Sequence, residues 1–196
     1  AEDGIRDALV GLVGSEMCIR DRPKTGGVAL SHALGRHVHR MGHETLLEHL
    51  PIWPPIITIV RDPVARWVSA YDMVDRQRRH VPESDRWPDA SAAALDPEGR
   101  AWYETYWKPV FYPQTRWLRD ARYALKRCWY ICHTETLDDD FATIREAIGA
   151  NDCVMPTKAS LRNQNQADKS VLTPEAQAAI REHYAQDYEL LSQLGD

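Results

Sequence analysis

One short block of residues limits most strongly what this chain can fold into. The apolar run Ile56-Ile57-Thr58-Ile59-Val60 is followed at once by Arg61-Asp62-Pro63. A run so rich in β-branched residues is typical of a strand that is buried on both faces of a parallel sheet. Pro63 cannot continue a central strand, because proline has no backbone N–H to donate. The block therefore predicts a strand over 56–60 that turns near Arg61 into another element.

The residues after this turn have the spacing of an amphipathic helix. Apolar side chains recur every three or four residues, at Val64, Trp67, Val68, Tyr71 and Val74. Pro63 suits the first turn of such a helix. Open α/β folds bind ligands beyond the carboxyl ends of their strands, where Arg61 and Ser69 could hold one phosphate. The alternative is that Arg61 and Asp62 only cap the turn, with Arg66 and Ser69 on a solvated helix face.

A second candidate anion site lies earlier, in Pro23-Lys24-Thr25-Gly26-Gly27. Glycines let the backbone approach an anion closely, and the amino terminus of a following helix favours negative charge. The stretch from Val28 to His39 is predicted to be that helix, and Lys24 would add a mobile cation. No Gly-Lys-Ser or Gly-Lys-Thr occurs in the chain, which argues against the nucleoside-triphosphate loop of ordinary kinases. Taken alone, the string could also be an ordinary turn.

Together these two elements resemble the sulfotransferase family. The string Arg-Asp-Pro-x-x-Arg-x-x-Ser-x-Tyr, from Arg61 to Tyr71, is similar to that family's element for a 3′-phosphate. Pro-Lys-Thr-Gly-Gly is similar to its element for the 5′-phosphosulfate of the donor, 3′-phosphoadenosine 5′-phosphosulfate. Weaker likeness in Pro113-Gln114, 130–137 and 184–191 extends the resemblance over about residues 23–191. Alternating strand and helix patterns predict a three-layer α/β sandwich with a mainly parallel sheet, and the resemblance implies its P-loop-like sulfotransferase form.

The resemblance implies an enzyme that moves a sulfuryl group from this donor to a hydroxyl, expected to be on a carbohydrate, without a metal. The donor-binding residues would be Lys24, Thr25, Gly26, Gly27, Val28, Ala29, Arg61, Ser69 and Arg162. Val28 and Ala29 stand where the family usually has Thr or Ser, which leaves open a donor-binding protein without activity. A nucleotide-dependent phosphotransferase and a core fragment of a larger enzyme are also compatible with these residues.

Sulfuryl transfer requires stabilised negative charge and a base for the proton of the acceptor. Lys24 is the candidate for the charge on the bridging oxygen. His43 lies between the two phosphate elements and is the candidate base, because a base must titrate near neutrality. A surface histidine is the competing interpretation of His43. Glu44 and Glu135 are the alternative bases.

The first 22 residues fit this picture poorly. Arg20-Asp21-Arg22 places charges where a strand should precede the phosphate loop. The string 1–22 also resembles the translation of a sequencing adaptor more than a protein segment. It is therefore expected to be non-native, with a single domain over 23–196. The alternative is a genuine amino terminus in which Met17-Cys18-Ile19 forms a short strand.

Composition narrows the class of partner and the compartment. The net charge of −5 disfavours a general nucleic-acid binder. No run of residues approaches the roughly 20 apolar positions of a membrane span. The four cysteines form no dense framework, so a cytoplasmic protein is expected, or a lumenal or membrane-anchored one if the native amino terminus is missing. Cys128 and Cys132 are expected to be core thiols rather than metal ligands, because in a strand they share one face while His133 points to the other. The oligomeric state stays open.

The remaining sequence predicts a strand over 127–132, a helix over 141–148 behind three aspartates, and a last helix from Thr173-Pro174-Glu175 to about residue 193. The polar, proline-containing residues 77–99 predict a long loop or lid. Four aromatic residues that follow are expected mostly to pack between helices: Tyr103, Trp107, Tyr112 and Trp117. A polar segment with Lys158, Arg162 and Lys169 is either a solvated loop or a closure over the 3′-phosphate.

Overall fold

The computed structural model describes residues 17–20, 25–41, 56–77, 87–117, 128–156 and 170–193. The chain forms two compact units, one of residues 1–60 and 118–162, the other of residues 61–117 and 163–196. The chain passes from one unit to the other after residues 60, 117 and 162, and the first of these points lies between Val60 and Arg61. Among the described residues, no helix has the length and apolar character needed to cross a membrane. A single domain over 23–196 stays a prediction.

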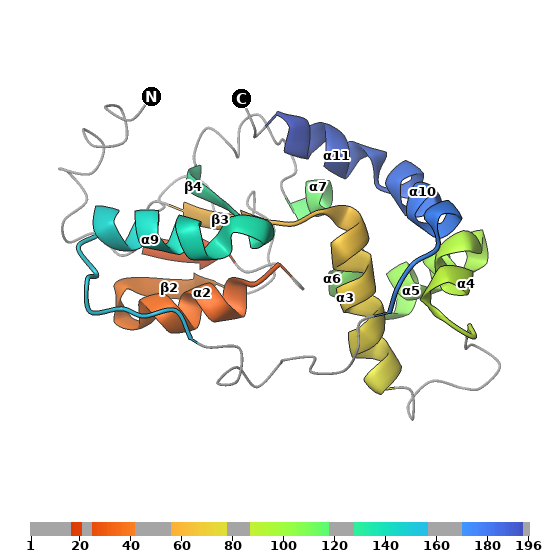
Figure 1. Ribbon diagram of the computed structural model, residues 1–196, viewed down its shortest axis with the longest axis horizontal. Coiled ribbons are helices and arrows are strands. Elements are labelled where there is room, and N and C mark those ends of the chain that lie inside the picture. Colours follow the sequence, from red (N-terminus) through yellow and green to blue (C-terminus); the bar gives the residue numbers. More distant parts are fainter. Residues whose placement is uncertain are drawn as a thin grey trace. The chain divides into compact units, whose positions relative to one another are not determined.

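The first unit is built on a parallel four-stranded sheet (Figure 1). Its strands are β1 (Met17–Arg20), β2 (Val38–Met41), β3 (Ile56–Val60) and β4 (Cys128–His133), in the spatial order β2-β1-β3-β4. Each neighbouring pair is parallel, with Ile57 beside Ile19 on one side and beside Tyr130 on the other. The predicted parallel sheet and the strands over 56–60 and 127–132 are therefore confirmed, and the carboxyl ends of all four strands share one edge.

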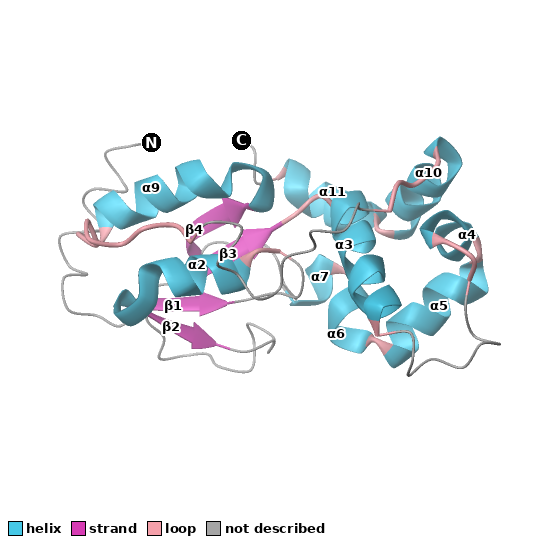
Figure 2. Ribbon diagram, turned by 60° about the horizontal axis from the view of Figure 1, so that its bottom comes forward, coloured by secondary structure: helices cyan, strands magenta, loops and turns pink. Residues whose placement is uncertain are grey.

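Two helices, α2 (Gly27–Leu34) and α9 (Leu137–Ala147), lie side by side over one face of this sheet (Figures 1 and 2). Buried side chains fill the space between helices and sheet: Ile19, Leu30, Ala33, Leu34, Val38, Ile57, Ile59, Cys132, Phe141 and Ile144. Strand β3 is buried along its whole length, as its apolar run predicts. The described part of this unit is an α/β arrangement of a parallel sheet with one helical layer, and it shows no third layer.

Strand β1 occupies an interior position in the sheet. It pairs with β2 on one side and with β3 on the other, and Ile19 is completely buried. This is the short strand over Met17-Cys18-Ile19 that a genuine amino terminus would form. Whatever the origin of the segment, Met17–Arg20 is part of the sheet.

The helix predicted over residues 28–39 ends earlier than expected. Helix α2 stops at Leu34, Gly35 adopts a φ of 48°, and a 3₁₀ turn over Gly35–His37 leads into β2. A positive φ is readily adopted only by glycine and is incompatible with a continuing right-handed helix. The β-branched Val38 then begins a strand. The helix prediction is therefore wrong beyond Leu34.

The second unit is helical. Its helices are α3 (Pro63–Arg76), α4 (Ala90–Leu95), α5 (Pro97–Tyr106), α6 (Lys108–Phe111), α7 (Gln114–Trp117), α10 (Pro174–His183) and α11 (Ala185–Ser192). Trp67 of α3 is 2% exposed, and the ring centroids of Tyr103 and Phe111 lie 5.8 and 4.9 Å from its own, edge-on. The helix starting at Pro63 is thus confirmed, as is the packing role expected for Tyr103.

Residues 77–99 are predicted to form a loop, but the described part from Trp87 onward is mostly helical. Asp89 and Asp96 each accept a hydrogen bond from a backbone N–H in the first turn of α4 and α5, at 2.8 and 3.0 Å. The Trp87 indole donates to Asp96 at 2.8 Å and is the main cause that lowers the pKa of this carboxyl. Pro97 starts α5 instead of preventing it. The loop prediction is wrong for these helical residues.

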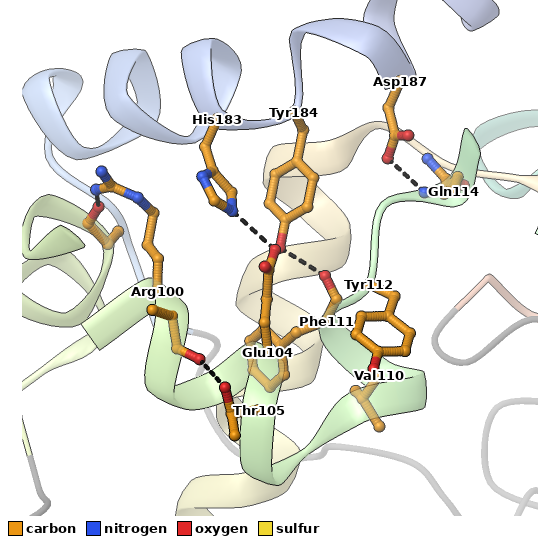
Figure 3. Close-up of polar contacts among 12 residues, drawn as sticks. Arg100, Glu104, Thr105, Val110, Phe111, Tyr112, Gln114, His183, Tyr184 and Asp187 are labelled. Atoms are coloured by element: carbon orange, nitrogen blue, oxygen red, sulfur yellow. Dashed lines mark hydrogen bonds and ion pairs between the residues drawn. The ribbon is translucent and has the colours of Figure 1, made fainter. Parts of the chain in front are cut away.

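The carboxyl-terminal helix is interrupted at Tyr184. The hydroxyl of Thr173 accepts a hydrogen bond from the N–H of Ala176 at 3.2 Å, so the predicted cap is confirmed. Tyr184 separates α10 from α11, is 2% exposed, and donates its hydroxyl to the carbonyl of Phe111 at 2.6 Å (Figure 3). Burial of this hydroxyl raises its pKa. The single helix predicted to run to residue 193 is therefore two helices.

Candidate nucleotide site

The described part of the glycine-rich element, residues 25–27, is called the glycine turn and lies at the carboxyl edge of the sheet. Gly26 precedes α2 with a φ of 91°, and its carbonyl accepts hydrogen bonds from the N–H groups of Ala29 and Leu30. The N–H groups of Gly27 and Val28 come before these in the first turn of the helix, where N–H groups have no intrahelical partner. Such groups and the helix dipole favour an anion. The N–H groups of Gly27 and Val28 are therefore the backbone donors that this turn could offer to a phosphate.

The glycine turn rests on the connection that follows β4. The Oγ1 atom of Thr134 lies 2.6 Å from the carbonyl oxygen of Thr25 and 3.1 Å from that of Val60. One hydroxyl thus joins the turn to the carboxyl end of β3. A Cβ atom added at Gly26 would lie 3.1 Å from Cδ2 of Leu137. The position of the turn is therefore set by hydrogen bonding and by close packing at the start of α9.

We expect Gly26→Ala to lower the free energy of unfolding by about 2 kcal/mol. A left-handed conformation costs an L-residue about 1–2 kcal/mol, and the added methyl group also meets Leu137. Gly149→Ala is the matched control, because Gly149 has a φ of 70° but no described atom lies within 4 Å of its added Cβ. Urea denaturation followed by circular dichroism compares the two. Equal losses at the two glycines would contradict the tight packing of the turn.

The side chains of this element are not equally accessible. Thr25 is fully buried, and its carbonyl oxygen accepts a hydrogen bond from the hydroxyl of Thr134. Val28 and Ala29 are half-buried. Neither offers a hydroxyl, so an anion at the described turn would meet its backbone N–H groups.

The predicted catalytic residues, Lys24 and His43, lie outside the described residues. The same is true of Arg162 and of the alternative base Glu44. Glu135, the remaining base candidate, is exposed in the 3₁₀ turn Thr134–Thr136 that follows β4. It is therefore the one base candidate placed by the described residues, next in sequence to the threonine that holds the glycine turn.

In the second unit, Asp62 fixes the Arg61-Asp62-Pro63 turn. Its Oδ1 accepts a hydrogen bond from the N–H of Ala65 at 2.8 Å and so caps α3, with Pro63 at the start of the helix. Its Oδ2 accepts a hydrogen bond from the hydroxyl of Tyr188 at 2.8 Å. Burial, and then this bond to Asp62, raises the pKa of Tyr188. Asp62 thus has the capping role that the sequence allows for it.

Gln114 holds the backbone of Arg61 through two hydrogen bonds. Its Oε1 accepts from the N–H of Arg61 at 3.0 Å, and its Nε2 donates to the carbonyl of Arg61 at 2.7 Å. The carboxylate of Asp187 in turn accepts from the N–H of Gln114 at 2.7 Å (Figure 3) and from the N–H of Thr115 at 2.8 Å. Gln114 and Asp187 are both buried. Together they fix the point from which the Arg61 side chain leaves the backbone.

Sequence reasoning identified these supporting residues only as weak family likeness, in Pro113-Gln114 and in 184–191. Their partners are distant in sequence: Gln114 is 53 residues from Arg61, and Asp187 is 73 residues from Gln114. Such pairs leave no periodic pattern in a single sequence. A buried glutamine and a buried aspartate are recognisable as supporting groups only when their hydrogen-bond partners are known.

Arg66 does not lie on a solvated face. It is 3% exposed, and its Nη1 and Nη2 donate to the carbonyls of Val110 and Tyr112 at 2.9 and 2.6 Å. Its guanidinium carbon lies 5.5 Å from the centroid of the Tyr184 ring. Arg66 therefore stabilises the carboxyl end of α6, and the solvated face considered for it is wrong. Ser69 is partly exposed on α3.

The two elements offer different chemistry to a ligand. The glycine turn offers backbone N–H groups and a helix dipole, whereas the second element offers the half-buried Arg61, whose guanidinium can form paired hydrogen bonds with a phosphate. No family model matches this chain, and no curated protein matches it significantly.

Proposed function

We propose that this chain binds 3′-phosphoadenosine 5′-phosphosulfate and transfers its sulfuryl group to a hydroxyl group of a carbohydrate. The observation that carries the proposal is that a glycine turn opens α2 at the carboxyl edge of a parallel sheet, while an Arg-Asp-Pro turn follows β3 directly in sequence. The sequence contains no Gly-Lys-Ser or Gly-Lys-Thr, which favours this donor over ATP.

In this proposal each element binds one end of the donor. The N–H groups of Gly27 and Val28, together with Lys24, stabilise the negative charge that develops on the bridging oxygen of the phosphosulfate. Arg61 and Ser69 bind the 3′-phosphate. The acceptor oxygen forms a bond to sulfur as the bond between sulfur and the bridging oxygen breaks. His43 takes the proton of the acceptor.

A donor-binding protein without activity is the second candidate. It is favoured by Val28 and Ala29, which are apolar at positions where sulfotransferases usually carry hydroxyls. Each missing hydroxyl removes a hydrogen bond worth about 1 kcal/mol. The two candidates are distinguished by incubating the protein with 3′-phosphoadenosine 5′-phosphosulfate, with and without a panel of oligosaccharides. An enzyme releases 3′-phosphoadenosine 5′-phosphate faster when an acceptor is present, whereas a donor-binding protein without activity does not.

Isothermal titration calorimetry with 3′-phosphoadenosine 5′-phosphate tests the donor site. We expect Arg61→Ala to weaken binding at least tenfold, since a hydrogen bond to a charged group contributes about 1.5–3 kcal/mol. Lys24→Ala should also weaken binding. Arg76→Ala is the matched control, because Arg76 is exposed at the last turn of α3, and it should bind like the wild type. A folded protein that does not bind this nucleotide, or that prefers ATP, would contradict the proposal.

A further inference from the structure

Three side chains with metal-binding atoms meet in the first unit. His37 ends the 3₁₀ turn after α2, and Asp152 and Cys153 follow α9 in sequence. A ring nitrogen of His37, a carboxylate oxygen of Asp152 and the Sγ atom of Cys153 all lie within 4.8 Å of one another. The glycine turn is at the start of α2 and this cluster lies beyond its end, so the cluster is separate from the candidate nucleotide site.

We propose that His37, Asp152 and Cys153 bind a zinc ion. Imidazole nitrogen, carboxylate oxygen and thiolate sulfur are all zinc ligands, at about 2.0–2.3 Å in tetrahedral sites. Tetrahedral bonds of this length place neighbouring ligand atoms roughly 3.5 Å apart. Nε2 of His37 already lies 3.6 Å from Oδ1 of Asp152. Three protein ligands leave the fourth position for a water molecule.

The environment of His37 supports this proposal independently. Its Nε2 atom is buried and has no hydrogen-bond partner among the described residues. A buried polar atom without a partner destabilises a fold by about 1–3 kcal/mol. The 3.6 Å separation from Asp152 is too long for a hydrogen bond, whereas a metal ion between the two atoms would satisfy both. The sulfur of Cys153 favours zinc over magnesium or calcium, which prefer oxygen ligands.

The charged neighbours of the cluster set the conditions for binding. Nη2 of Arg36 lies 3.2 Å from Oδ2 of Asp152, so this guanidinium competes with a metal for the same carboxylate. Arg145 donates to the carbonyl of Cys153 at 3.4 Å. Burial, and then the charge of Asp152, raises the pKa of the Cys153 thiol. A metal must therefore displace the thiol proton when it binds.

A zinc ion here would connect the turn after α2 with the turn after α9. Sγ of Cys153 already lies 3.9 Å from the carbonyl oxygen of Leu34, the last residue of α2. The ion would thus cross-link the helical layer of α2 and α9, at the end of α2 opposite the glycine turn. The ion would stabilise this layer and would take no part in sulfuryl transfer.

Cobalt titration of the full chain tests the site. Bound Co²⁺ should give the thiolate-to-cobalt charge-transfer band and the intense visible bands of tetrahedral coordination, and Zn²⁺ should abolish them. Cys153→Ser should remove the charge-transfer band, and His37→Ala or Asp152→Asn should weaken Co²⁺ binding at least tenfold. The matched controls are His32→Ala and Asp138→Asn, at exposed positions of α2 and α9, which should bind Co²⁺ like the wild type.

The Arg36→Ala variant tests whether Asp152 is a metal ligand or only the partner of Arg36 in an ion pair. If Arg36 competes with the metal, its removal should raise the Co²⁺ affinity several-fold, and added Zn²⁺ should raise the melting temperature. The proposal is overturned if the folded wild-type chain shows no charge-transfer band, or if the band persists in Cys153→Ser. It is equally overturned if Asp152→Asn, at a 65% exposed side chain that folding should tolerate, binds Co²⁺ with unchanged affinity.

Discussion

Asp187→Asn is expected to lower the free energy of unfolding by about 3 kcal/mol, although the two side chains have the same shape. The two carboxylate oxygens each accept a hydrogen bond, from the N–H groups of Gln114 and Thr115, and Asp187 is fully buried. Asparagine keeps one oxygen but turns an amide N–H₂ toward the other backbone N–H, so two donors face each other. Thermal unfolding followed by circular dichroism should show a decrease of about 6–12 °C in Tm, at roughly 2–4 °C per kcal/mol.

Glu189→Gln is the control for this prediction. It makes the same chemical change on the same helix, α11, at an exposed position, and should stay within about 0.5 kcal/mol of the wild type. Gln114→Ala should reproduce part of the loss caused by Asp187→Asn. Because Gln114 holds the backbone of Arg61, the Gln114→Ala substitution should also weaken binding of 3′-phosphoadenosine 5′-phosphate by the folded protein. An Asp187→Asn protein as stable as the wild type would contradict the supporting role of the carboxylate.

The strand and helix around Arg61 could be predicted because their signals are local. A five-residue apolar run gives β3 with the expected bounds, 56–60. A proline, followed by apolar residues three and four apart, gives α3 from Pro63. The signal for β4 is local in the same way, and its observed bounds, Cys128–His133, differ from the predicted 127–132 by one residue at each end.

The missed elements are those in which a local signal has two meanings. The prolines of residues 77–99 suggest a loop, yet Pro97 opens α5 behind the capping Asp96. Glycine at position 35 ends α2, although the apolar spacing continues past it. Helix α9 begins at Leu137, so the three aspartates expected before the helix lie in its first turn. Aspartate stabilises both the cap and the first turn, and composition alone does not separate the two.

Of the candidate site, the sequence could predict only the motif residues that are proposed to contact the donor. Motifs single out Gly26 and Arg61 because they carry distinctive residue types at fixed spacing. The groups that hold them in place come from distant parts of the chain: Thr134 is 109 residues from Thr25. A lone threonine or glutamine is common in any sequence, so only the folded chain reveals these supports.

Arg66→Met is expected to lower the free energy of unfolding by about 3 kcal/mol or more, because a buried carbonyl without a donor costs about 1–3 kcal/mol. Methionine can replace the aliphatic stem of Arg66 but not its hydrogen bonds to the carbonyls of Val110 and Tyr112. Urea denaturation provides the measurement. Arg76→Met, at the exposed end of α3, is the control and should change stability by less than about 0.5 kcal/mol.

The Arg66→Met variant also distinguishes two roles that the Arg-Asp-Pro-x-x-Arg string allows for Arg66, which are to stabilise the fold or to bind the phosphate. Its guanidinium is already engaged by carbonyls and is 3% exposed, so the affinity of the folded fraction for 3′-phosphoadenosine 5′-phosphate should stay within about twofold of the wild type, or about 0.4 kcal/mol. Arg61→Ala should show the opposite pattern, with a large loss of affinity and a smaller loss of stability. A stable Arg66→Met protein that fails to bind the nucleotide would instead assign Arg66 to the phosphate, as the family-like string alone suggests.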